Sequence, residues 1–163
     1  MATIREATQA DWPTIVSIYN AAVPEQTATA DLDPLSLAEC RPWLRDRQGY
    51  PLWAIACEGT VAGWLAFEPF YDRAAYAATA EVSLYIAPAW RGCGLGQQLL
   101  QAAIGTGPRL GFKTLVGLVF EHNSASLRLF GRLGFVRWGY LPRVAELDSR
   151  ERDLAVLGCR ISP

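Results

Sequence analysis

The sequence is poor in the residues that most often build metal and redox sites. His122 is the only histidine, and the four cysteines (Cys40, Cys57, Cys93 and Cys159) lie far apart with no CxxC pair. Zinc sites need such ligands in close groups, and a disulfide framework needs a dense set of cysteines. We therefore expect no metal site, and we expect reduced thiols, as in a cytoplasmic protein.

Charge of one sign and long apolar runs are also missing. The 15 basic and 16 acidic residues give a formal net charge of −1, and there is no basic stripe of the kind that binds nucleic acid. No stretch approaches the roughly 18 apolar residues of a transmembrane helix. The first residues, MATIREATQADW, contain no apolar core of a signal peptide. The sequence thus predicts no nucleic-acid or membrane partner.

What the chain does have is enough apolar material for a core. Of its 163 residues 51% are hydrophobic, which predicts one folded domain over residues 1–163. Apolar periodicity and turn residues predict strands near 2–8, 50–70 (a hairpin turning at Glu58-Gly59), 79–88, 113–120, 135–147 and 150–161. Helices are expected after Asp11, after Asp33 to about Arg47, from Leu95 to Gly105, and after Asn123 until Gly134. This mixture predicts an α+β or mixed-sheet α/β class, with strand 113–120 buried on both faces.

The segment PAWRGCGLGQQLL, residues 88–100, places three glycines between an expected strand and an expected helix. Backbone N–H groups and the positive end of a helix dipole make such a loop an anion site. Gly96 is followed by Gln97, so the loop is no P-loop, and the spacing of Gly92, Gly94 and Gly96 does not match a dinucleotide fingerprint. The alternative is a turn that is glycine-rich without binding anything.

The pattern that fits is Arg/Gln-x-x-Gly-x-Gly/Ala, met by Arg91, Gly94 and Gly96. With it, the chain resembles the GNAT superfamily of N-acetyltransferases over nearly its whole length. The stretches IYNAAV, RAAYAATAEVSLYI and HNSASLRLFGRLGF resemble the phosphinothricin acetyltransferase-like branch. The resemblance implies acetyl-CoA as co-substrate, a small amino-acid-like amine as acceptor, and a homodimer. It also implies a mostly antiparallel sheet of about six or seven strands flanked by about four helices.

The resemblance further implies a set of site residues. Glu81 would be the general base, on one strand face with Ser83 and Tyr85. Acceptor contacts are implied for Arg73, Tyr76, Glu81 and Ser83. Cofactor contacts are implied for main-chain groups of Leu84 and Ile86, for the loop Arg91, Gly92, Cys93, Gly94, Leu95, Gly96 and Gln97, and for Asn123, Ser126 and Phe130.

Each assignment has a plainer alternative. The alternative for Glu81 is a strand-end glutamate paired with an arginine. For Asn123 it is a helix N-cap only, and for Arg73 it is a solvated loop residue. Phe130 stands where the family often has a tyrosine or histidine that acts as general acid, and phenylalanine cannot donate a proton. Tyr85 is the possible substitute. A thiolate whose conjugate acid has a pKa of about 8.5 needs little help to leave.

Three functions remain open from the sequence. The first is acetylation of an amino-acid-like amine. The second keeps the co-substrate but changes the acceptor to a polyamine, an aminoglycoside or a protein N-terminus, which a carboxylate-rich pocket would favour. The third, motivated by Phe130, is a non-catalytic CoA-binding sensor.

Overall fold

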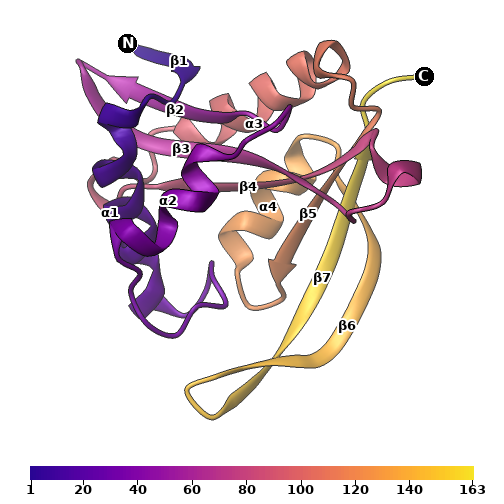
Figure 1. Ribbon diagram of the computed structural model, residues 1–163. Coiled ribbons are helices and arrows are strands. Elements are labelled where there is room, and N and C mark those ends of the chain that lie inside the picture. The colour runs from indigo at the N-terminus through magenta and orange to yellow at the C-terminus, as the bar shows by residue number, and fades with distance from the viewer.

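A seven-stranded sheet forms the centre of the computed structural model, which describes residues 1–163 (Figure 1). Its strand order is β1-β2-β3-β4-β5-β7-β6. The strands are β1 (Ala2–Glu6), β2 (Leu52–Cys57), β3 (Thr60–Pro69), β4 (Thr79–Ile86), β5 (Thr114–Phe120), β6 (Val136–Leu147) and β7 (Arg150–Arg160). Every neighbouring pair is antiparallel except β4 and β5. The expected mixed, mostly antiparallel sheet is confirmed, as is the hairpin between β2 and β3.

Four helices cover the two faces of this sheet (Figure 1). They are α1 (Trp12–Ala22), α2 (Leu37–Arg45), α3 (Leu95–Thr106) and α4 (Ser124–Arg132). On one face, α1 and α2 pack on alternate residues of β3, among them Trp64 and Ala66. On the other, α3 and α4 pack on Leu65 and Phe67 in the larger core cluster. No helix has the length and apolarity that spanning a membrane requires.

The first helix begins where the sequence predicts, but Asp11 does not cap it. Its carboxylate makes no cap hydrogen bond to α1. It accepts from the Arg5 guanidinium at 2.6 and 3.0 Å and from the Thr8 N–H at 2.8 Å. Asp11 occupies the N-cap position of α1, but a charged partner on β1 holds its carboxylate more strongly than helix N–H groups would.

The second helix starts later than predicted. Ser36, not Asp33, is its N-cap: the Ser36 hydroxyl accepts from Glu39 N–H at 3.1 Å, and the Glu39 carboxylate accepts from Ser36 N–H at 2.6 Å. This reciprocal capping box satisfies two N–H groups at once, which one aspartate three residues earlier does not do.

Candidate functional site

The parallel contact between β4 and β5 is short, and a gap opens beyond it. Only Thr79–Glu81 pair with Thr114–Val116. After that point β4 continues beside β3 to Ile86, while β5 continues beside β7 to Phe120. Two neighbouring strands therefore diverge in the middle of the sheet, and their facing edges lose their partners.

The hydrogen-bond alternation shows which groups of β4 face this gap. Ala87 N–H donates to Ala62 C=O at 2.8 Å, opposite it across the β3–β4 ladder. Since antiparallel pairing alternates, Tyr85 and Ser83 also direct their main-chain groups toward β3. The main-chain groups of Leu84 and Ile86 then point the other way, into the gap. An extended ligand could pair with them as an added strand does.

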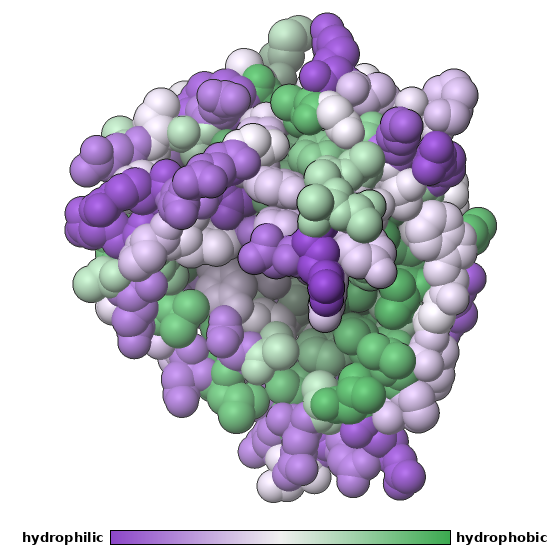
Figure 2. Space-filling view, turned by 45° about the vertical axis from the view of Figure 1, so that its right-hand side comes forward, coloured by the Kyte–Doolittle hydropathy of each residue, from purple (hydrophilic) through white to green (hydrophobic).

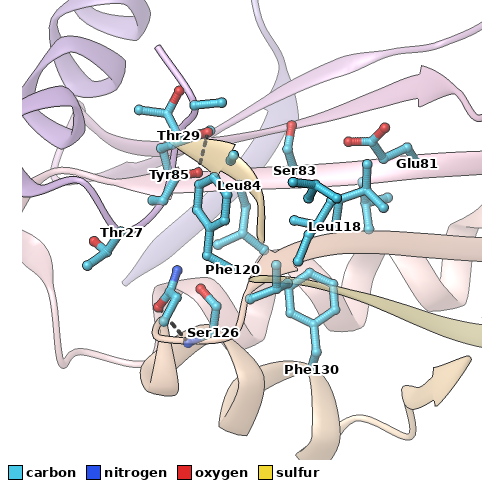
Figure 3. Close-up of a pocket in the computed structure, with 18 residues that line it drawn as sticks. Thr27, Thr29, Glu81, Ser83, Leu84, Tyr85, Leu118, Phe120, Ser126 and Phe130 are labelled. Carbon is cyan, nitrogen blue, oxygen red and sulfur yellow. Dashed lines mark hydrogen bonds between the residues drawn. The ribbon is translucent and has the colours of Figure 1, made fainter. Parts of the chain in front are cut away.

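The gap holds a cavity of about 350 Å³, which we call the gap cavity (Figure 3). Its wall is formed by β4, the end of β5, the loop after α1, the start of α4 and the β6–β7 hairpin: Thr27–Ala30, Glu81–Tyr85, Leu118–Phe120, Asn123, Ser126, Phe130, Val144, Ala145 and Leu154. In Figure 3, Glu81 and Ser83 point to the same side of β4, whereas Ser126 and Phe130 come from α4 on the opposite side. Leu118, expected to be buried, is 42% exposed because it faces this opening.

The glycine loop lies at one end of the gap. Gly92 and Gly94 have φ of +76° and +79°, a conformation that costs other residues free energy. Gly94 directly precedes α3. None of the six backbone N–H groups from Gly92 to Gln97 donates to a protein acceptor. A cavity of about 330 Å³, the loop cavity, is lined by Gly92, Gly94, Leu95 and Gly96 of this segment and by Leu84, Ile86, Asn123 and Ser126, among others.

Gly96 is constrained by close packing and not by a positive φ. It has an ordinary helical conformation, and an added Cβ would lie 3.3 Å from Leu129 Cδ2 and 3.4 Å from Leu84 Cδ1. The Leu129 side chain would have to shift by a few tenths of an ångström to make room for it. The glycine therefore allows the N-terminus of α3 to sit close to the gap.

Arg91 has a partner that the sequence does not suggest. Its guanidinium donates to both carboxylate oxygens of Glu25 at 2.6 and 2.8 Å, and its Nε donates to Ile86 C=O at 3.3 Å. Glu25 lies just after α1, 66 residues earlier in the chain. Arg91 thus ties the segment after α1 to the glycine loop, and its charge is already paired with that of Glu25.

Glu81 is the carboxylate of the gap cavity. It has no ion-pair partner, so the alternative of a strand-end glutamate paired with an arginine is wrong. Burial raises the pKa of Glu81, and the negative charge of Glu68, directly opposite on β3, raises it further. A carboxylate with these surroundings binds a proton more readily than an exposed one does.

A second cavity, of about 360 Å³, lies under α1 and α2, and we call it the helix cavity. Glu81, Ser83 and Tyr85 line both it and the gap cavity, so the two spaces meet along one face of β4. Four carboxylates line it and no basic side chain does: Asp31, Glu39, Glu68 and Glu81. In Figure 2 the molecule is hollowed near the centre of the view, and apolar side chains gather below the hollow, where the β6–β7 hairpin lies.

The loop after α1 is fastened to both sides of the gap. The Tyr85 hydroxyl donates to Ala28 C=O at 3.0 Å, and His122 Nε2 lies 2.7 Å from Gln26 C=O. Tyr19 donates its hydroxyl hydrogen to the Asp31 carboxylate. Burial raises the pKa of Tyr85 to about 12. Tyr85 is therefore a structural contact of this loop, and its proton is held firmly.

The start of α4 agrees with the sequence prediction. Asn123 caps the helix, since its Oδ1 accepts from Ser126 N–H at 3.2 Å. Phe130 is 4% exposed, and its ring fills the notch above Gly117, where an added Cβ would lie 2.6 Å from the ring. Position 130 thus contributes an apolar wall to the gap cavity and no proton donor.

Two predicted acceptor residues do not join the others. Arg73 and Tyr76 lie in the β3–β4 connection, both exposed, and neither lines the gap, helix or loop cavity. Tyr76 packs instead with Phe70 and Tyr71, at ring-centroid distances of 5.9 and 5.5 Å. Within one chain these two residues therefore lie apart from Glu81, and their contact with the acceptor stays a prediction.

Four residues that line the helix cavity were not predicted from the sequence: Asp31, Trp43, Trp64 and Glu68. Strand alternation in residues 60–69 could have placed Glu68 and Trp64 on one face. Nothing local could have placed Trp43 or Asp31 beside them, since both arrive by tertiary packing.

Comparison with known proteins gives one consistent result. Residues 7–135 match the model of the acetyltransferase (GNAT) family. The chain is 41% identical over 162 residues to YwnH of Bacillus subtilis, provisionally named a phosphinothricin acetyltransferase, covering 98% of this chain and 99% of that protein. It is 38% identical over 165 residues to the L-methionine sulfoximine/L-methionine sulfone acetyltransferase of Pseudomonas aeruginosa, covering 99% and 96%.

A solved structure agrees. The phosphinothricin acetyltransferase of Sinorhizobium meliloti, crystallised in complex with acetyl-CoA, superposes with a TM-score of 0.94 at 30% identity, covering 99% of this chain and 89% of that one.

Proposed function

Because the chain belongs to the GNAT family of acetyltransferases, we propose that it transfers an acetyl group from acetyl-CoA to the amine of a small amino-acid-like molecule. The names of the relatives from Pseudomonas and Sinorhizobium support this acceptor class and this co-substrate. The observation that carries the proposal is the strand gap itself. It combines an anion-binding loop, unpaired strand edges and one unpaired, half-buried carboxylate.

We assign the pyrophosphate to the glycine loop. Six free N–H groups from Gly92 to Gln97 and the N-terminus of α3 suit a doubly charged anion. Cys93 would contribute its N–H only, since its thiol donates to Arg91 C=O at 3.7 Å. Arg91 would add a charge-assisted contact by exchanging part of its bond to Glu25.

The arm that follows would lie along the loop and gap cavities. Main-chain groups of Leu84 and Ile86 would pair with its amides, and Asn123 and Ser126 would contact it from α4. Phe130 would close the far wall. Leu95 lines the loop cavity at the first turn of α3.

Acetyl-CoA supplies an activated acyl group whose thiolate leaves readily, its conjugate acid having a pKa of about 8.5. Glu81 would take the proton from the acceptor ammonium, directly or through water, so that the neutral amine attacks the acyl carbon. A leaving thiolate needs no dedicated acid at neutral pH. Tyr85 could serve as that acid only by giving up its bond to Ala28. Ser83 would contact the acceptor beside Glu81.

The test is thiol release from acetyl-CoA with L-methionine sulfoximine as acceptor. Wild type should release free thiol, and Glu81→Gln should lower kcat about 10²-fold while leaving the acetyl-CoA Kd unchanged. Ser83→Ala, on the same strand face, is the matched control and should change kcat far less. Thiol release by Glu81→Gln at the wild-type rate would remove Glu81 as the base.

One observation favours a second acceptor class. Four carboxylates and no basic side chain line the helix cavity, and aromatic rings of Trp43 and Trp64 share its wall. Carboxylates and aromatic faces both attract cations, so a polyamine or aminoglycoside would suit this space. A screen of spermidine, an aminoglycoside and L-methionine sulfoximine in the thiol assay separates the two classes by their kcat/KM values.

We also propose that the protein works in the cytoplasm as a homodimer. Exposed apolar residues on the edge strand β6 support an interface: Val136, Trp138, Tyr140, Leu141 and Val144. Light scattering at micromolar concentration should give twice the chain mass of 17.9 kDa. A mass of one chain would rule the homodimer out.

A further inference from the structure

We propose that Glu68 is a positioning residue for Glu81: its fixed negative charge keeps Glu81 basic enough to take a proton from the acceptor ammonium. This inference rests on the proposed role of Glu81 as the base. It extends the base mechanism to Glu68, which lies outside the gap cavity, and to Trp43 and Arg47, whose side chains hold Glu68 in place.

The two carboxylates are direct neighbours across the sheet. Glu68 on β3 and Glu81 on β4 are register partners in an antiparallel pair. Directly opposite side chains stand on the same face, with Cβ atoms about 4.5–5.5 Å apart. Both side chains line the helix cavity. Like charges in this arrangement are unfavourable, so placing two carboxylates here has a cost in free energy that something else must offset.

Glu68 is held in place by two donors from the far side. Trp43 Nε1 donates to its carboxylate, and Arg47 Nη1 donates to the same oxygen at 3.1 Å. The Arg47 guanidinium stacks over the Trp43 ring at 4.6 Å. Both contacts fix the position of the Glu68 carboxylate opposite Glu81.

Arg47 is itself fixed and has no bond to Glu81. Its Nη2 donates to Phe67 C=O at 2.6 Å and its Nε to Tyr50 C=O at 3.0 Å. With a side chain only 15% exposed, it is locked behind Glu68. The cation therefore anchors Glu68 without neutralising Glu81.

The other groups around Glu81 act more weakly. No basic side chain lines either of its cavities, and β5 presents the apolar Val116 beside it. The titratable groups facing it from α1, the following loop, α2 and β4 are Tyr19, Asp31, Glu39, Cys40 and Tyr85. Of these acids, Asp31 already accepts from Tyr19 and Glu39 from Ser36. After burial, Glu68 is the contribution that raises the pKa of Glu81.

The chemical benefit follows from the proton transfer. An exposed glutamate is a weak base toward an ammonium group, and general-base catalysis improves as the pKa of the base approaches the working pH. A neighbouring fixed anion moves Glu81 in that direction without touching the acceptor.

The experiment follows the ionisation of Glu81 by ¹³C NMR of protein labelled at glutamate side-chain carboxyl carbons, with Glu81→Gln identifying the resonance. Glu68→Gln, which keeps the shape and an acceptor oxygen for Trp43, should lower the titration midpoint of Glu81 by about half a pH unit or more. Arg47→Met should raise it, because Glu68 then loses its counter-charge. Glu39→Gln is the matched control: it removes one negative charge from the same cavity and should shift the midpoint less.

The acid limb of the kcat/KM profile should move in the same directions, with the acetyl-CoA Kd unchanged. Glu68→Gln and Arg47→Met are expected to shift the Glu81 titration midpoint in opposite directions, which a loss of packing in both variants would not produce. An unmoved Glu81 midpoint in Glu68→Gln, or a shift matched by Glu39→Gln, overturns the proposal. Trp43→Phe, which removes only the N–H donor, serves if Arg47→Met does not fold. Absence of thiol release with every acceptor would refute the proposed function but leave the NMR titration readable.

Discussion

Replacing Gly94 by alanine separates two properties of the glycine loop: its backbone strain, which affects thermal stability, and its binding of acetyl-CoA. Gly94 has φ of +79°, and an added Cβ would meet no protein atom within 4 Å. The free energy of unfolding of the ligand-free protein should therefore fall only by the cost of a left-handed non-glycine residue, about 1–2 kcal/mol. For a chain of this size that corresponds to a fall in Tm of about 2–8 °C.

Gly134 provides the matched control. It has φ of +93°, an added Cβ there would also meet nothing within 4 Å, and it follows α4 away from the loop cavity. Gly134→Ala should therefore lower Tm by a similar amount. Only Gly94→Ala places a methyl group in the cradle of free N–H groups, so only this variant should weaken acetyl-CoA binding, by at least about tenfold or 1.4 kcal/mol.

Calorimetric titration with acetyl-CoA and thermal unfolding of both variants give the two quantities. If Gly94→Ala binds acetyl-CoA as tightly as wild type while its Tm falls like that of Gly134→Ala, the loop is only a turn. The assignment of the pyrophosphate to this loop would then be wrong.

Three further perturbations test contacts around the gap. Glu25→Gln removes the carboxylate that competes with phosphate for Arg91, so the acetyl-CoA Kd should fall about threefold. A larger Kd by calorimetry would instead mean that Glu25 positions Arg91. Tyr85→Phe should raise the acceptor KM several-fold with little change in kcat, because the loop after α1 loses the hydrogen bond from Tyr85 to Ala28 C=O. A large fall in kcat alone would instead indicate that Tyr85 acts as the general acid. Asp11→Asn should lower the free energy of unfolding above pH 4. The Arg5 guanidinium holds the pKa of Asp11 at about 2, below its unfolded value, so this stability is lost as pH falls from about 4 to 2. Urea unfolding across this range should show a flatter pH dependence for the variant.

The sequence predicted those parts of the site that depend on local geometry. Gly92 and Gly94 were identifiable because a short glycine-rich link between a strand and a helix allows few backbone conformations, and both have positive φ. Asn123 was identifiable because an asparagine before an amphipathic run is a strong N-cap. The alternation of Glu81 with Tyr85 likewise follows from the strand period.

Long-range partners were beyond such reasoning. The bond between Arg91 and Glu25 joins residues 66 positions apart, and no local pattern selects one carboxylate among 16 acidic residues. Arg73, which the family resemblance implied as an acceptor contact, is exposed in the β3–β4 connection and lines neither cavity beside Glu81, so that contact stays a prediction. Burial patterns within a short irregular segment do not reveal which way such a side chain points. At Ser36 the capping-box spacing was present but was outweighed by the Asp-Pro pair before it.

The short contact between β4 and β5 also divides the molecule mechanically. Residues 2–86 supply β1–β4 and residues 114–160 supply β5–β7, so the sheet consists of two plates from successive halves of the chain. Three register pairs, at Thr79–Glu81 and Thr114–Val116, form the only strand-to-strand hinge between the plates. Rotation about that hinge changes the width of the gap while leaving every ladder within each plate intact. A molecule that pairs with both inner edges would therefore bridge the two plates across the gap.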